Sequence, residues 1–297
     1  MTTLQEIGTR LGGGRQLTAQ DSEAVVASRD LLGLGALADD CRRGRHGDRV
    51  TFVRVQEIPV DTVEAGDIEM LPAAGEARIS GRIPERGQAV RAVQRVVSAA
   101  GSIPVTGFAL DDLAETSGWK PHAVVDVLAA LKDAGLSCVA EARAERLPGP
   151  EWLEAASRAG LPIARLTVGE PAGDAGGVEL IRRVAAWGGA LAHVHAFAPL
   201  ARALPAQPTT GYRDLRQVAL ARLLVDNVDS IQVDWSLYGP KLAQVALIFG
   251  ASDVDAVSPD DGRLGTRRAP LAEIIRNVRA SALVPVERNG RFELVQT

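Results

Sequence analysis

Cysteine is scarce in this chain, which has 297 residues and only two cysteines, Cys41 and Cys138. The two lie far apart in the sequence, and neither stands in a spacing typical of a metal site. A C-x-x-C or C-x-x-x-C-x-x-C motif is therefore excluded. We expect both thiols to be buried or incidental.

Other absences narrow the class of protein further. Aromatic residues make up only 4% of the chain, so the core must be built mainly from Ala, Val, Leu and Ile. No apolar run approaches the roughly 20 residues that a membrane span needs, and the first fifteen residues contain no apolar signal core. The net charge is −4 and basic residues alternate with acidic ones, so no nucleic-acid or membrane partner is expected. These features predict a cytoplasmic protein.

From about Val50 onward, short β-like runs alternate with amphipathic helical stretches. Repeated β–α alternation is typical of a parallel sheet with helical crossovers, and eight strands in one series favour a closed TIM-type (β/α) barrel. The expected strands are Val50–Val60, Ala77–Ile83, Ile103–Phe108, Ser137–Ala142, Pro162–Val168, Ala190–Ala198, Ser230–Trp235 and Asp253–Val257.

The flanking segments complete the predicted domain plan. Residues 1–49 are expected to form a helical extension, residues 50–281 the barrel, and residues 282–297 a hairpin tail packed on it. Asn289–Gly290 supplies the turn signal of that hairpin. Between Val60 and Ala77 there is room for about one short helix, so the barrel is expected to be shortened after its first strand.

Several segments, taken in order, resemble one radical-SAM family, which includes aminofutalosine synthase, the dehypoxanthine futalosine cyclase and the deazaflavin (FO) synthase. The most specific stretch reads GPKLAQ at Gly239–Gln244 and FGASDVD at Phe249–Asp255. The other matching segments are His46–Phe52, Leu128–Leu136, Ala144–Leu147, Phe197–Leu200, Leu215–Asp226 and Val284–Arg288. The resemblance implies a radical-SAM-like barrel.

One departure from this family concerns its cofactor. The family carries a C-x-x-x-C-x-x-C loop after the first strand, and the corresponding places here fall near Glu64, Ile68 and Leu71. Three thiolates hold such a [4Fe–4S] cluster, and the family implies that its fourth iron binds S-adenosylmethionine (SAM). We therefore expect no iron–sulfur cluster, no bound SAM and no other metal. The family's G-H-x-E-T element also reads differently here, as VGEPA from Val168.

Candidate binding residues are the polar side chains expected at the barrel mouth, where the strands end. They are Arg54, Gln56, Glu141, Glu170, His193, His195, Asp234, Asp253 and Asp255. His193 and His195 share one strand face, as do Asp253 and Asp255, because side chains two apart point the same way. The histidines fit either a metal or acid/base pair or polar lining. The aspartates fit either hydrogen bonding to a substrate or structural hydrogen bonding.

The sequence leads to one main hypothesis and two rivals. The main one is a cluster-less paralogue associated with futalosine-pathway menaquinone biosynthesis, a pseudoenzyme and not a radical-SAM enzyme by itself. It would bind a small polar, futalosine-type metabolite, or pair with an active radical-SAM paralogue or a second copy of itself. The first rival is a non-radical lyase or hydrolase that uses His193, His195 and acidic residues at the mouth. The second is an assembly subunit without a ligand.

Overall fold

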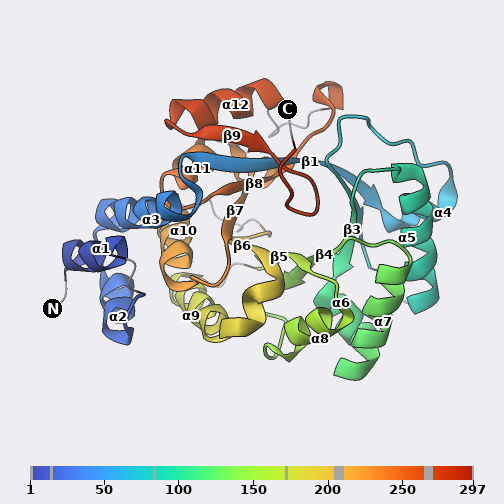
Figure 1. Ribbon diagram of the computed structural model, residues 1–297, viewed down its shortest axis with the longest axis horizontal. Coiled ribbons are helices and arrows are strands. Elements are labelled where there is room, and N and C mark those ends of the chain that lie inside the picture. Colours follow the sequence, from blue (N-terminus) through green and yellow to red (C-terminus); the bar gives the residue numbers. More distant parts are fainter. Residues whose placement is uncertain are drawn as a thin grey trace.

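Eight parallel strands close into a barrel in the computed structural model, which describes residues 3–13, 16–82, 85–170, 173–203, 211–263 and 270–295 (Figure 1). Successive strands pair side by side, and β1 pairs with both β2 and β8, which closes the sheet. The predicted TIM-type barrel is confirmed. Its strands are β1 (Arg49–Pro59), β2 (Glu76–Ser80), β3 (Val105–Ala109), β4 (Cys138–Arg143), β5 (Ile163–Val168), β6 (Val194–Ala201), β7 (Ser230–Asp234) and β8 (Asp253–Val257).

Helices lie between successive strands and cover the outside of the barrel (Figure 1). The local sequence explains where they stop. Helix α8 buries Trp152 and Leu153 and ends at Gly160, which adopts the left-handed conformation that lets its N–H reach the carbonyl of Ala156. These helices are α4 (Val60–Ala65), α5 (Arg86–Ala100), α6 (Leu110–Thr116), α7 (Pro121–Asp133), α8 (Glu151–Ala159), α9 (Gly173–Ala186), α10 (Tyr212–Leu224), α11 (Trp235–Leu247) and α12 (Leu271–Ala280), with short 3₁₀ turns η1 (Gly188–His193) and η2 (Asp261–Arg263).

The connection from β1 to β2 is as short as the sequence predicts. It contains only α4, a helix of six residues. Gln56 of β1 fastens the rest of the connection, because its side-chain amide donates to the carbonyl of Glu69 at 2.8 Å and accepts from the N–H of Leu71 at 2.8 Å.

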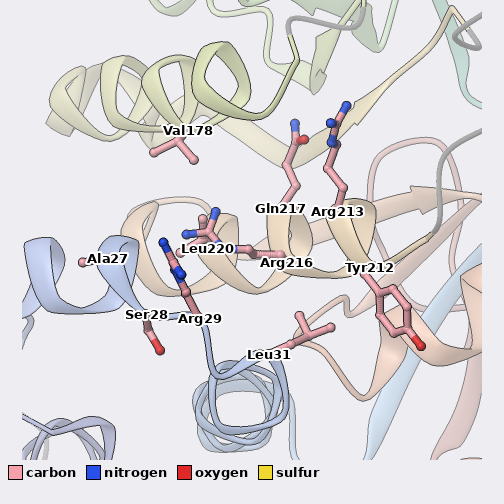
Figure 2. Close-up of a pocket in the computed structure, with 10 residues that line it drawn as sticks. All are labelled: Ala27, Ser28, Arg29, Leu31, Val178, Tyr212, Arg213, Arg216, Gln217 and Leu220. Atoms are coloured by element: carbon pink, nitrogen blue, oxygen red, sulfur yellow. The ribbon is translucent and has the colours of Figure 1, made fainter.

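The N-terminal extension consists of α1 (Leu4–Gly12), α2 (Ala19–Ala27) and α3 (Leu31–His46). Reciprocal capping boxes at Thr3 and Thr18 begin the first two helices. Helix α3 packs along α10 of the barrel, and the turn between α2 and α3 borders a cavity beside α10 (Figure 2). The extension is thus built onto the outer helical layer.

The C-terminal tail returns to the barrel in a way the sequence predicts only in part. Strand β9 (Val284–Glu287) pairs in parallel with β1. The tail then folds back as an antiparallel hairpin through a bridge between Arg288 and Leu294. Its tip is wider than the expected two-residue turn, since Asn289 pairs with Glu293 and Phe292 takes the left-handed backbone conformation at φ 63°.

Across the described residues, none of the helices is long and apolar enough to cross a membrane.

Candidate functional site

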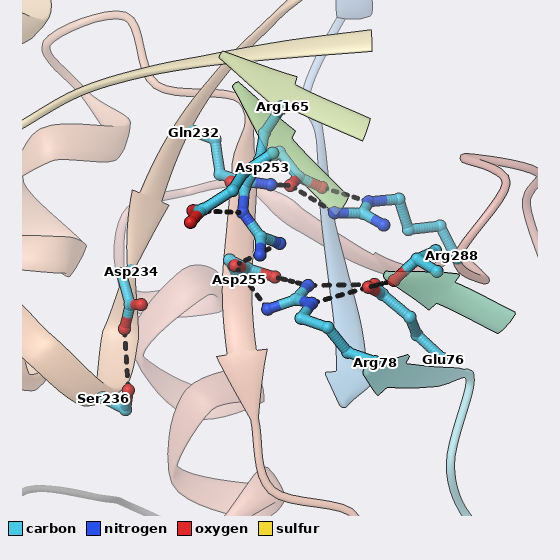
Figure 3. Close-up of polar contacts among 12 residues, drawn as sticks. Glu76, Arg78, Arg165, Gln232, Asp234, Ser236, Asp253, Asp255 and Arg288 are labelled. Carbon is cyan, nitrogen blue, oxygen red and sulfur yellow. Dashed lines mark hydrogen bonds and ion pairs between the residues drawn. The ribbon is translucent and has the colours of Figure 1, made fainter. Parts of the chain in front are cut away.

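Charged side chains fill the inside of the barrel in two layers, the opposite of the usual apolar packing of TIM-barrel interiors (Figure 3). Most of them come from alternate positions of the barrel strands, so their side chains share the inner face, whereas Arg202 and Arg288 directly follow β6 and β9. The upper ionic layer, toward the carboxyl ends of the strands, comprises Arg78, Glu141, Arg165, Arg202, Asp234 and Asp255. The lower ionic layer comprises Thr51, Glu76, Thr106, Gln232, Asp253 and Arg288.

Asp255 is the centre of the upper ionic layer. It is completely buried, and its carboxylate accepts from Arg78 at 2.8 and 3.1 Å and from Arg165 at 3.1 Å. Arg78 also donates to Glu76 at 2.7 and 3.0 Å, which joins the two layers. Strands β2, β5 and β8, far apart in sequence, are therefore linked across the barrel by one carboxylate.

The electrostatic effect of this arrangement is large. Burial by itself raises the pKa of Asp255, but Arg78 and Arg165 together outweigh it and hold that pKa well below its ordinary value. Burial lowers the pKa of Arg165, and the nearby charge of Arg78 lowers it further. The Nε–H of Arg165 is buried and has no hydrogen-bond partner among the described residues, because Glu141 lies 4.0 Å away.

The rest of the upper ionic layer is open to solvent in part. Arg202, just after β6, lies 3.7 Å from Glu141 and 3.4 Å from Asp234. The side chains of Arg202 and Glu141 are 29% and 23% exposed. Asp234 ends β7 and caps α11 by accepting the N–H of Leu237 at 2.9 Å. The layer holds three guanidiniums and three carboxylates, so its formal charges cancel.

Asp253 is the centre of the lower ionic layer. Asp253 accepts from Arg288 at 2.6 and 2.7 Å, from Gln232 at 2.7 Å, and from the hydroxyl of Thr51. The sequence led us to expect Asp253 at the barrel mouth. It is instead the first residue of β8, and it therefore lies below the mouth. The side chains of Asp253 and Asp255 do lie on the same face of β8. Among the described contacts, arginines of the chain itself donate hydrogen bonds to both carboxylates.

The histidine pair lies at the wrong end of the barrel for the predicted site. The turn η1 occupies Gly188–His193, so β6 begins only at Val194, and both histidines fall at the amino end of the strand. His193 is exposed, whereas His195 stacks on Phe292 of the tail with ring centres 4.8 Å apart. His195 lines a cavity of about 410 Å³ there, with His46, Asp229 and Arg291. Burial lowers the pKa of His195, and Arg288 lowers it further.

Three other predicted site residues also lie apart from the ionic layers. Arg54 is bound to Glu287 of β9, at 2.7 and 3.1 Å, and Gln56 fastens the β1–β2 connection. Glu170 is exposed two residues after β5, and no polar contact ties it to the others in the part of the chain that the structure describes. Of the candidates expected at the barrel mouth, the structure brings together Glu141, Asp234 and Asp255 and places the others apart from these three.

Sequence reasoning missed the arginines. Arg78, Arg165 and Arg202 hold the three carboxylates, yet none was a candidate. A signal was present: Glu76 and Arg78 in β2, and Arg165 and Thr167 in β5, stand at alternate positions of short apolar runs. Strands buried on both sides are normally apolar throughout, so such alternation indicates a polar barrel interior.

Comparison with known proteins identifies the class to which this barrel is similar. The chain is 34% identical over 97 residues to aminodeoxyfutalosine synthase of Streptomyces coelicolor, a match that covers 30% of this chain and a quarter of that relative. It is 26% identical, over 98% of each chain, to 5-amino-6-(D-ribitylamino)uracil–L-tyrosine 4-hydroxyphenyl transferase of Methanoculleus marisnigri. No protein-family model matches.

Solved structures agree on the fold. Methylornithine synthase superposes with a TM-score of 0.64 at 15% identity, over 95% of this chain and 97% of that one. The homologues and these structural neighbours are radical-SAM enzymes, so the resemblance predicted from the sequence is confirmed.

These comparisons contradict the expectation that neither a cluster nor SAM is involved, because radical-SAM relatives use both. The donor set of this chain is a separate observation. Cys41 lies in α3 and Cys138 in β4, and the described residues contain no group of three His, Cys, Asp or Glu side chains that could hold a metal ion. This donor set does not fit a cluster held by three thiolates of one chain.

Proposed function

We propose that the protein acts by binding, as a pseudoenzyme of the futalosine pathway that holds a small polar metabolite in its upper ionic layer. The single observation that carries this proposal is the Nε–H of Arg165, a buried donor with no hydrogen-bond partner in the described chain, with the Glu141 carboxylate 4.0 Å away. Leaving such a donor unpaired costs about 1–3 kcal/mol. A ligand that brings a carboxylate or carbonyl oxygen to this donor would recover that free energy.

The surrounding groups define the kind of ligand. Arg202, Glu141 and Asp234 offer donors and acceptors that are partly exposed, whereas Asp255 is already saturated. Because the layer is neutral overall, it suits a ligand rich in hydrogen-bonding groups rather than one of high charge. A futalosine-type nucleoside, which carries a sugar, amide groups and a carboxylate, has this character, and the futalosine-pathway relatives support the choice.

The test is isothermal titration of the purified protein with futalosine-type nucleosides, with thermal shift as a second readout. The substitution Arg165→Lys keeps a positive charge beside Asp255 but removes the Nε–H, and Arg202→Gln removes a partly exposed guanidinium. We expect each to weaken binding about tenfold, the effect of losing a charge-assisted hydrogen bond. Arg276→Gln, on the exposed side of α12, is the matched control and should leave affinity unchanged.

Two outcomes would count against this function. If no nucleoside binds, the metabolite proposal fails, and pairing with an active radical-SAM enzyme or with a second copy becomes the better explanation. If binding persists unchanged in Arg165→Lys and Arg202→Gln, the site lies elsewhere. A lyase or hydrolase based on His193 and His195 with acidic residues at the mouth is less well supported, because these histidines lie at the opposite end of the barrel from Asp234.

A further inference from the structure

A second cavity, outside the barrel, has the character of an anion site. It measures about 530 Å³ and lies between the α2–α3 turn, α9 and α10 (Figure 2). This volume falls in the range of small-molecule sites, about 300–1,000 Å³. None of its lining residues belongs to the upper or lower ionic layer.

Positive charge is concentrated in this cavity. Among the residues that the structure describes, its lining includes Arg29, Arg213 and Arg216 but no aspartate or glutamate, although the chain as a whole has a net charge of −4. Two acidic residues lie near Arg29 in the sequence, and both have other partners. Glu23 pairs with Arg182 at 2.8 Å, and Asp30 caps α3 by accepting the N–H of Gly33.

Two of these three arginines, Arg216 and Arg29, differ in how they are held. Arg216 is partly buried and donates to the carbonyl of Val26, which holds it against the end of α2. Arg29 is exposed on the turn and has no polar partner among the described residues. Both side chains line the cavity, Arg29 from the α2–α3 turn and Arg216 from α10 (Figure 2).

Helix α10 adds to the same potential. Tyr212 and Arg213 in its first turn line the cavity, so the positive end of the helix dipole lies beside it. Gly211 begins the helix, and no side chain caps it in the described part of the chain. The one carboxylate of that turn, Asp214, is buried and is not among the cavity-lining residues that the structure describes.

The cavity also has an apolar part. Leu31, Val178 and Leu220 contribute to its lining, and Tyr212, which also lines it, is 68% exposed. Guanidiniums bind phosphate oxygens in pairs, and exposed aromatic rings stack on flat heterocycles. We propose that this cavity binds a nucleotide, with its phosphates on Arg29 and Arg216 and its base on the apolar side toward Tyr212.

Titration of the full chain with ADP, adenosine and inorganic phosphate tests this proposal. We expect ADP to bind most tightly, phosphate more weakly, and adenosine weakest. Arg29→Gln should weaken ADP binding at least about tenfold, since a charge-assisted contact is lost. Arg276→Gln, an exposed arginine on α12, should have no effect. Raising the ionic strength from about 0.1 M to about 1 M, which shortens the screening length from about 10 Å to about 3 Å, should also weaken binding.

The outcomes separate the two sites. Arg165→Lys and Arg202→Gln in the barrel should leave ADP affinity unchanged, so failure of the metabolite site would not affect this result. The nucleotide assignment is overturned if Arg29→Gln binds ADP like the parent protein, if adenosine or inorganic phosphate binds as tightly as ADP, or if ADP does not bind.

Discussion

Replacing Asp255 by Asn is the most direct test of the ionic interior. The change keeps the shape of the side chain but removes the negative charge that Arg78 and Arg165 share. Both arginines are almost completely buried, so they cannot recover solvation by moving into water. Breaking a buried ion pair by removing one partner costs about 3–5 kcal/mol, which is a large part of the roughly 5–15 kcal/mol that stabilises a typical domain.

Urea unfolding, followed by circular dichroism and by the fluorescence of buried Trp235, measures this loss. Asp126→Asn, an exposed carboxylate of α7, is the matched control and should change the free energy of unfolding by less than about 0.5 kcal/mol. A loss below about 1 kcal/mol in Asp255→Asn would refute the reasoning, because it would place Asp255 among ordinary surface residues.

The pH dependence supplies a second criterion. The pKa of Asp255 is held below its ordinary value in the folded protein, so its contribution to stability is complete above the unfolded value of about 3.9 and is lost as the pH falls below it. The variant lacks this titration. The difference in unfolding free energy between parent and variant should therefore be constant from about pH 5 to 7 and shrink below about pH 4. A difference that grows on acidification would contradict the assignment of the ion pairs.

Three further predictions concern the tail, the thiols and the extension. Phe292→Ala removes a ring that lies 3.7 Å from the Arg288 guanidinium and stacks on His195. We expect the free energy of unfolding to fall by about 1–3 kcal/mol. Because burial lowers the pKa of His195, we also expect that pKa to rise in the variant, as measured by NMR titration. An unchanged His195 titration would be inconsistent with this packing. Burial raises the pKa of Cys138 to about 12, so its thiol should resist Ellman's reagent at about pH 8 until urea is added; rapid labelling of native protein would contradict its burial. Gly35→Ala would place a methyl group 2.6 Å from the ring of Phe249 and should lower the free energy of unfolding by about 1–3 kcal/mol. In the control Gly44→Ala, on the same helix, the added methyl group meets no atom within 4 Å, so this change should be neutral or stabilising. Equal effects of the two substitutions would show that α3 does not pack as described.

The sequence by itself determined the class of fold and the resemblance to radical-SAM enzymes. The β–α rhythm is a local property, because strand and helix periodicities and glycine caps such as Gly160 are written in neighbouring residues. The short β1–β2 connection could likewise be measured along the chain. The domain plan of residues 1–49, 50–281 and 282–297 remains a prediction. Helix α3 of the first segment packs against α10 of the barrel.

Only the tertiary structure decided which polar side chains meet. Strand β6 begins at Val194 and not at the expected Ala190, so His193 and His195 lie at the amino end of the strand, opposite the mouth, because a residue's height in the barrel depends on where its strand begins. Asp255 faces Arg78 and Arg165 because closure of the sheet brings β2, β5 and β8 around one interior, and no spacing in the sequence encodes that contact. Ion pairs between residues 90 and 177 positions apart depend on the whole barrel, which is why the carboxylates could be predicted and their partners could not.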